Sequence, residues 1–209
     1  MKKFLYLILL LLSLNFQLYS IIFEKAFFMK RECSMELNLN EIENLIKGCG
    51  FETHIEAPTE EIPFDQLYVG LGHDEEKRDR CLQIRLYSQT FPETPFSQEP
   101  ISPKYLDFFT SLPFFIDQKA FPDVARLASL INKVLSLPGF VLSESDKQVY
   151  YRYLYLNSKE EMASKDIELI LMTILYQIET FSPSFEELAL GEKTYEEVVK
   201  AAAAYCQED

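Results

Sequence analysis

The residues best suited to chemistry lie in the stretch Gly70-Leu71-Gly72-His73. Two glycines at this spacing can begin a loop whose backbone N–H groups hold a phosphate, and His73 beside Asp74 could bind a cation or act as a base. The third glycine and the following helix of such a loop are missing from the sequence. We therefore interpret residues 73–79 as an exposed turn that carries a solvated histidine.

His54, the acidic pairs and the cysteines are the other candidates for chemistry. His54 has no cysteine, serine or acid at a motif spacing, so it is expected to be structural. Pairs of neighbouring acids occur at 60–61, 75–76, 160–161, 186–187 and 196–197. Because neighbours in sequence do not face each other on a helix or strand, these pairs are unsuited to general acid–base catalysis.

The four cysteines do not form a recognisable metal or redox motif. The spacings between Cys33, Cys49, Cys81 and Cys206 are 16, 32 and 125 residues, which fit neither a redox pair nor a zinc site. In an exported protein Cys49 and Cys81 could form a disulfide, whereas in a cytosolic protein both would be small buried hydrophobic residues. We expect no catalytic residue, no metal and no cofactor, and hence a protein that is not an enzyme.

The composition is that of an acidic chain that can bury a core. Of its 209 residues, 48% are hydrophobic and 14% aromatic, which suffices for one domain of ordinary size and excludes intrinsic disorder. The chain has 20 basic and 33 acidic residues, a formal net charge of -13 at pH 7. Proteins that bind nucleic acid neutralise its phosphates, so nucleic acid is not an expected partner.

An apolar segment stands at the N-terminus. Residues 4–23 follow Lys2 and Lys3 and carry no charge, and as a helix they would be about 30 Å long, roughly the thickness of a bilayer's hydrocarbon core. Three interpretations stay open: a signal peptide or membrane anchor within 1–28, a true translation start at Met29 or Met35, and a core helix. The first predicts an anchored or exported protein, and the second predicts a cytoplasmic one.

The first half of the remaining chain predicts one helix and three strands. Apolar residues from Ile42 to Cys49 recur at helical spacing behind Asn38, which is suited to cap a helix. Residues 64–72 and 81–88 are rich in strand formers and predict a hairpin. Four prolines mark 91–104 as a semi-rigid loop inside the domain, and an apolar strand at 106–116 follows. Pro113 would place this strand at an edge of the sheet or interrupt it.

The second half predicts three helices and a second hairpin. A helix begins at Pro122 and ends at Pro138-Gly139, another begins at Ser164 and is expected to stop at Pro183, and a capping box opens the last helix, 194–204. Between the first two lies a hairpin of 140–142 and 149–156. The second strand alternates Val149, Tyr151, Tyr153 and Tyr155 on one face with Tyr150, Arg152, Leu154 and Leu156 on the other.

The stretch 125–190 carries a resemblance to a known family. In it Leu130-Ile131-Asn132 lies in a helix, and Gly139-Phe140-Val141-Leu142, a charged turn, the strand 150–156 and a long apolar helix follow. This pattern resembles the YbjN domain and the related type III secretion chaperone-like fold. The resemblance implies an α+β domain at 36–190, an antiparallel sheet with helices packed on it in the order α-β-β-β-α-β-β-α. Residues 191–209 would then form an extra C-terminal helical extension.

The resemblance also implies a function. Chaperones of this type are acidic cytosolic homodimers without an active site, and they hold an extended segment of a secreted protein over apolar patches. We therefore expect a non-enzymatic, chaperone-like protein whose partner is a protein client or a second copy of itself. The alternative is a membrane-anchored or exported structural or interaction protein that reuses this fold, with residues 4–23 in the membrane. The candidate interface residues are Leu169, Met172, Tyr176, Tyr151, Tyr153 and Tyr155.

Overall fold

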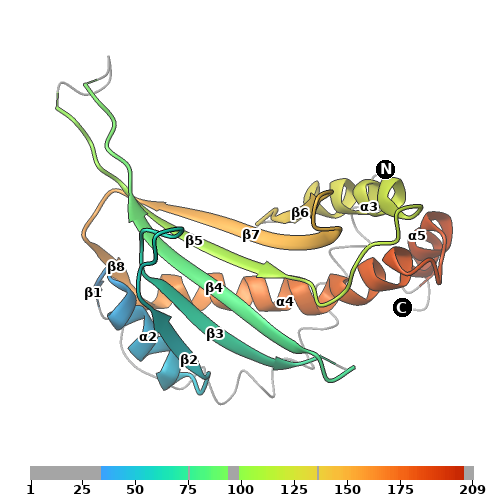
Figure 1. The fold of residues 1–209 in the computed structure, drawn as a ribbon, viewed down its shortest axis with the longest axis horizontal. Helices are drawn as coiled ribbons and strands as arrows, with labels where there is room; N and C mark the ends of the chain where they lie inside the picture. The colour runs from blue at the N-terminus through green and yellow to red at the C-terminus, as the bar shows by residue number, and fades with distance from the viewer. Residues whose placement is uncertain (1–33, 75, 94–98, 136, 205–209) are drawn as a thin grey trace. The chain divides into compact units, whose positions relative to one another are not determined.

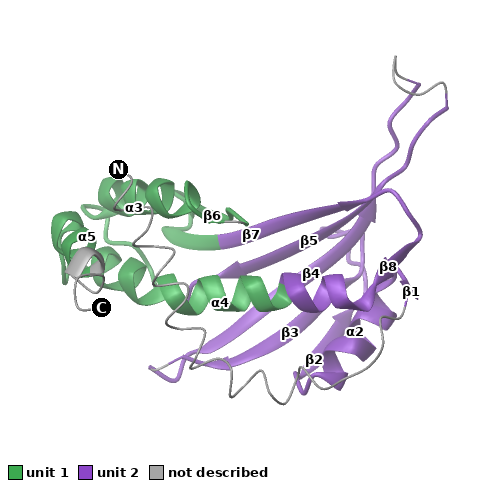
Figure 2. Cartoon of the chain, turned by 180° about the vertical axis from the view of Figure 1, so that it is seen from behind, with its two compact units in different colours: residues 1–30, 114–150, 171–209 green, residues 31–113, 151–170 purple. Residues whose placement is uncertain are grey.

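The computed structural model describes residues 34–74, 76–93, 99–135 and 137–204, which fall into two compact units. Among these residues, unit 2 comprises 34–113 and 151–170, and unit 1 comprises 114–150 and 171–204 (Figure 2). Strand β7 (Gln148–Asn157) and helix α4 (Ser164–Ala189) each contribute residues to both units. Neither unit is therefore a continuous stretch of sequence.

Unit 2 is built around antiparallel strands. Its elements in chain order are β1 (Ser34–Glu36), α2 (Leu39–Gly48), β2 (Thr53–Glu56), β3 (Gln66–His73), β4 (Asp79–Ser88), β5 (Lys104–Ser111), residues 151–157 of β7, β8 (Glu161–Ala163) and residues 164–170 of α4 (Figure 1). Strands β2 to β5 pair antiparallel in chain order, and β7 follows β5 in the sheet. Strands β1 and β8 form a separate antiparallel pair.

The sequence explains where helix α2 begins. The side-chain oxygen of Asn38 accepts the backbone N–H of Glu41 at 2.8 Å, which satisfies one of the free donors at the helix start and confirms the predicted cap. Glu41 in the first turn and Lys47 in the last turn complement the helix dipole. Ile42 and Ile46 lie one turn apart and are fully buried, so one face of the helix packs into the core of unit 2.

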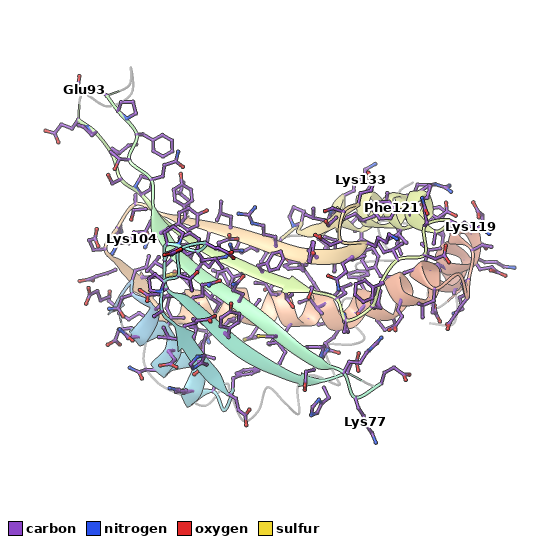
Figure 3. All side chains as sticks on the ribbon, viewed as in Figure 1. Lys77, Glu93, Lys104, Lys119, Phe121 and Lys133 are labelled. Atoms are coloured by element: carbon purple, nitrogen blue, oxygen red, sulfur yellow. The ribbon has the colours of Figure 1, made fainter. Side chains whose placement is uncertain are left out.

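Strands β4 and β5 are joined by a projecting arm. Phe91 and Ile101 exchange backbone hydrogen bonds of 2.8 and 3.2 Å, so the described part of the predicted loop 91–104 is a paired ribbon. Figure 3 shows Lys104 at the base of this arm and Glu93 far out along it. The prolines thus limit regular strand to the base of the arm without preventing the two chain segments from pairing.

Unit 1 contains the remaining helices and the second hairpin. Its elements are α3 (Phe121–Asn132), β6 (Phe140–Ser143), residues 148–150 of β7, residues 171–189 of α4, and α5 (Tyr195–Ala204). The predicted capping box is present at the start of α5: the Thr194 N–H donates to the Glu197 carboxylate at 2.8 Å, and the Glu197 N–H donates to the Thr194 hydroxyl at 3.3 Å. The expected extension 191–209 therefore contributes a well-capped helix to unit 1.

The α+β fold, an antiparallel sheet with helices packed on it, is confirmed. The strand order of the six-stranded sheet is β2-β3-β4-β5-β7-β6. The short strands β1, β2 and β8, of three or four residues each, are absent from the prediction. The predicted strand 106–116 already ends at Ser111, two residues before Pro113.

The prediction that Pro183 ends its helix is wrong, because α4 continues through Pro183 to Ala189. A proline inside a helix costs about 3 kcal/mol through a lost hydrogen bond and a steric clash. Pro183 is exposed, while Phe181 and Phe185 on either side of it are buried. The Phe185 ring lies 4.9 Å from the ring of Phe140, so packing within unit 1 holds the last turns in place.

No helix among the described residues is both long and apolar enough to cross a bilayer. The apolar segment 4–23 lies outside the described residues.

Candidate functional site

Among the described residues, the sheet of unit 2 has one face that the helices cover and one face that they leave open. The covered face carries the fully buried residues Leu67, Leu82, Ile84, Leu106 and Phe108. Helix α2, with the buried Ile42 and Ile46, contacts β2 and β3, and Ile167 of α4 is also fully buried in this unit. Side chains alternate along each strand, so the intervening residues point to the opposite side. We call this side the open face; it comprises His54, Glu56, Gln66, Tyr68, Gln83, Arg85, Tyr87, Tyr105, Asp107, Phe109, Arg152, Leu154 and Leu156.

A row of charged and polar residues crosses the open face from β2 to β7. The strand register places Glu56 opposite Gln66, Gln66 opposite Arg85, and Arg85 opposite Asp107. The row ends at Arg152, whose Nε and Nη2 donate to the two Asp107 oxygens at 2.9 and 3.0 Å. We call these five residues the charged row.

Asp107 is the anchor of the charged row. The residue is only 1% exposed, and its carboxylate receives the two parallel hydrogen bonds of Arg152 in the fork geometry that suits arginine. The same hydrogen bonds raise the pKa of Arg152. This pair holds the Arg152 side chain in one orientation on the surface, although about half of that side chain is exposed.

Arg85 is held less tightly than Arg152. Its Nη2 lies 3.8 Å from the Asp107 carboxylate, and its guanidinium lies 5.7 Å from the centre of the Phe109 ring. Its buried Nε has no hydrogen-bond partner among the described residues. One carboxylate therefore serves two arginines, and Arg85 keeps donors that a further acceptor could use.

Aromatic rings lie beside the charged row. Tyr87 and Tyr105 are directly opposite each other on β4 and β5, and their rings stack at 5.3 Å with an angle of 10° between the planes. Phe64 extends the group, with its ring centre 6.1 Å from that of Tyr87. Leu154 and Leu156 share a face of β7 with Arg152 and are 43% and 58% exposed. The open face thus combines ordered arginine, stacked tyrosine and accessible leucine.

A polar network occupies the neighbouring strands. The Gln83 amide donates to the Gln66 side-chain oxygen and, at 3.1 Å, to the Tyr68 hydroxyl, which itself donates to Gln66 at 3.3 Å. Burial raises the pKa of Tyr68. These contacts satisfy the side-chain oxygen of the buried Gln66 and fix the side chains next to Arg85.

The tyrosines predicted as interface residues lie on the covered face. Tyr151 is fully buried, and the same burial raises its pKa; Tyr153 is half-buried, with its ring centre 6.3 Å from that of Phe108. Tyr155 is also half-buried. The alternation predicted for β7 is correct, but the side chains that reach solvent are Arg152, Leu154 and Leu156.

The three predicted interface residues on helix α4 are divided between the units. Leu169 is 47% exposed in unit 2, whereas Met172 and Tyr176 are half-buried in unit 1. That these three residues form an interface stays a prediction. Sequence reasoning missed Asp107, Arg85 and the Tyr87–Tyr105 pair, although alternation along 104–111 and 79–88 was a usable signal for their common face.

His73 and Asp74, the first candidates for chemistry, stabilise the turn between β3 and β4. His73 Nδ1 lies 2.8 Å from Asp79, and the Asp74 carboxylate accepts both the backbone N–H and the Nε of Arg78, at 2.8 and 2.6 Å. These hydrogen bonds lower the pKa of Asp74 despite partial burial. Within the part of the chain that the structure describes, no group of three or more His, Cys, Asp or Glu could hold a metal ion.

Cys49 and Cys81 are free thiols rather than a disulfide. Cys49 is half-buried and Cys81 is exposed, so neither is the buried hydrophobic residue that the sequence predicts for a cytosolic protein. Partial desolvation nevertheless raises the pKa of both thiols. Cys33 and Cys206 lie outside the described residues.

Neither a family model nor a curated protein matches this chain. The resemblance to the YbjN domain and the secretion chaperones therefore stays a prediction from the pattern of residues.

Proposed function

We propose that this chain is a non-enzymatic, chaperone-like protein that binds a protein partner on the open face of unit 2. The observation that carries the proposal is the side-by-side arrangement of the Tyr87–Tyr105 stack and the Arg85–Asp107–Arg152 group. Tyrosine and arginine are enriched among the few residues that supply most of the binding energy in protein interfaces. The partner class is the one expected from the sequence, a protein client or a second copy of the chain.

The order of these side chains supports the proposal. Immobilising a flexible side chain on binding weakens the affinity by about 0.5–1.5 kcal/mol for each side chain. Arg152 is already fixed by two hydrogen bonds and Tyr105 by ring stacking, so this cost is reduced before a partner arrives. The leucines of β7 add apolar area that a partner would remove from water.

One route to a client is obstructed at the edge strand β6. The Asn132 amide donates to the Phe140 carbonyl at 2.7 Å, and its oxygen accepts the Phe140 N–H at 3.0 Å. A client that extended the sheet as a further strand would need these same backbone groups of Phe140. We therefore favour binding on the sheet face over strand addition at β6.

The proposal is tested by removing the aromatic stack. The variant Tyr87→Ser with Tyr105→Ser should lose the stoichiometric protein partner, whether another chain or a second copy, that native mass spectrometry detects with the wild type purified from its own cells. We expect binding to weaken by at least about tenfold, the effect of losing hot-spot aromatic residues. The control is Phe115→Ser, which removes a 67% exposed ring in unit 1.

A wild-type protein that carries no stoichiometric protein partner would contradict the proposal. So would a double variant that keeps its partner while its circular dichroism spectrum matches the wild type.

The apolar segment favours a second candidate, a membrane-anchored or exported interaction protein. Residues 4–23 have the length and the lack of charge that a membrane span requires. Retention of the native full-length chain in membranes after carbonate extraction would support this candidate. Complete release into the soluble fraction would count against the anchor.

A further inference from the structure

We infer that the partner on the open face is a second copy of this chain, docked with its charged row running in the opposite direction. The inference rests on the proposed function, because it assumes that the open face binds protein. It is carried by the order of charges in the row, which reads Glu56, Gln66, Arg85, Asp107, Arg152 from β2 to β7.

The charged row is neutral as a whole but has unlike ends. It contains two carboxylates and two guanidinium groups, with an acid at the β2 end and an arginine at the β7 end. A strongly acidic or strongly basic partner would gain attraction at one end of the row and meet repulsion at the other. The row is therefore poorly suited to a partner that carries a single sign of charge.

A second copy in reverse orientation matches both ends at once. In a two-fold symmetric interface, if residue i of one copy contacts residue j of the other, then residue j of the first copy also contacts residue i of the second. Reversal brings Glu56 of each copy to Arg152 of the other, so one geometry creates two identical ion pairs. Arg85 lies at the centre of the row, so the two Arg85 side chains face each other in this arrangement. Each is already paired with Asp107 of its own copy, which offsets their repulsion.

The dimensions of the row fit sheet-on-sheet packing. Neighbouring strands lie about 4.8 Å apart, so a row over five strands is about 19 Å long, and facing sheets pack about 10 Å apart. Side chains as long as arginine and glutamate can meet across that distance. The exposed Leu154 and Leu156 then lose contact with water at the same interface.

The test is the oligomeric state of the full chain, measured by sedimentation equilibrium at micromolar concentrations. Wild type should be a dimer. Glu56→Arg replaces the acidic end of the row with a like charge to Arg152, and Leu154→Asp places a charge in the apolar part; each should weaken the dimer by at least about tenfold. The matched control is Leu190→Asp, a 51% exposed leucine in unit 1, which should leave the dimer unchanged.

The inference is overturned if the wild type is a monomer, if both open-face variants stay dimeric, or if Leu190→Asp dissociates the dimer equally. Circular dichroism of each variant confirms that it is folded. These results separate the inference from the proposed function: a monomer that still binds a different protein through Tyr87 and Tyr105 removes the second copy and leaves the binding face standing.

Discussion

At the residue scale, Asp107 holds the arginines of the open face in place. The side chain is fully enclosed on the open face, yet it is satisfied by an arginine that is half-exposed. Removing one member of a buried ion pair is costly because the other is left without compensation. Here Arg152 can turn to water, which reduces that cost.

We predict that Asp107→Ala lowers the free energy of unfolding by about 2–3 kcal/mol, the range for losing a charged hydrogen-bond partner when the remaining group can be partly hydrated. Urea unfolding followed by circular dichroism measures the change. Asp65→Ala is the control, because Asp65 is an exposed aspartate of the same unit, and it should stay within about 0.5 kcal/mol of wild type. An equal effect of the two substitutions would contradict the role given to Asp107.

Arg152 and Asp107 also show what a sequence can say about single residues. Alternation along 149–156 places Arg152, Leu154 and Leu156 on one face, and the structure agrees. The same alternation along 104–111 places Asp107 with Tyr105 and Phe109, but the carboxylate looks like an ordinary solvated acid until Arg152 is known to lie on the next strand. The pairing joins residues 45 positions apart, and no local pattern contains it.

At the element scale, Asn132 joins helix α3 to strand β6. Its oxygen accepts the N–H groups of Gly139 and Phe140 at 3.1 and 3.0 Å, and its amide donates to the Phe140 carbonyl at 2.7 Å. One side chain thus closes the connection between the helix and the strand. The same contacts satisfy backbone groups at the edge of the sheet, a common means of protecting an edge strand.

We predict that Asn132→Ala destabilises unit 1 by about 2–3 kcal/mol, because three hydrogen bonds are lost and only some of these groups can turn to water. Amide hydrogen exchange at Gly139 and Phe140 should accelerate in the same variant. Ser129→Ala changes an exposed position of the same helix and serves as the control. Unchanged exchange at both amides would refute the role of Asn132.

Element boundaries were predictable where a local signal sets them. The caps at Asn38 and Thr194 and the two hairpins depend on neighbouring residues, and they are present as expected. Helix α4 differs because its course past Pro183 depends on Phe140, a residue distant in sequence. Tertiary packing outweighs the local preference of proline there.

At the scale of the whole molecule, the α+β fold follows from the order of elements, but the division into two units does not. Residues 114–150 are inserted between parts of unit 2, and β7 and α4 are shared. The sequence predicts one domain at 36–190, because no stretch with the composition of a linker marks the places where the chain passes from one unit to the other. Alternation distinguishes the two faces of β7, but which face a helix covers depends on residues from other parts of the chain.

Site-specific photo-crosslinking in the native cells tests most directly whether the open face of unit 2 binds protein. A photoreactive phenylalanine derivative at Tyr105 should form a discrete protein adduct, and the same group at Phe115, an exposed ring of unit 1, should not. An adduct of twice the chain's mass identifies a second copy, and another mass identifies a client. The absence of any adduct at Tyr105, or equal adducts at both positions, would contradict protein binding by the open face.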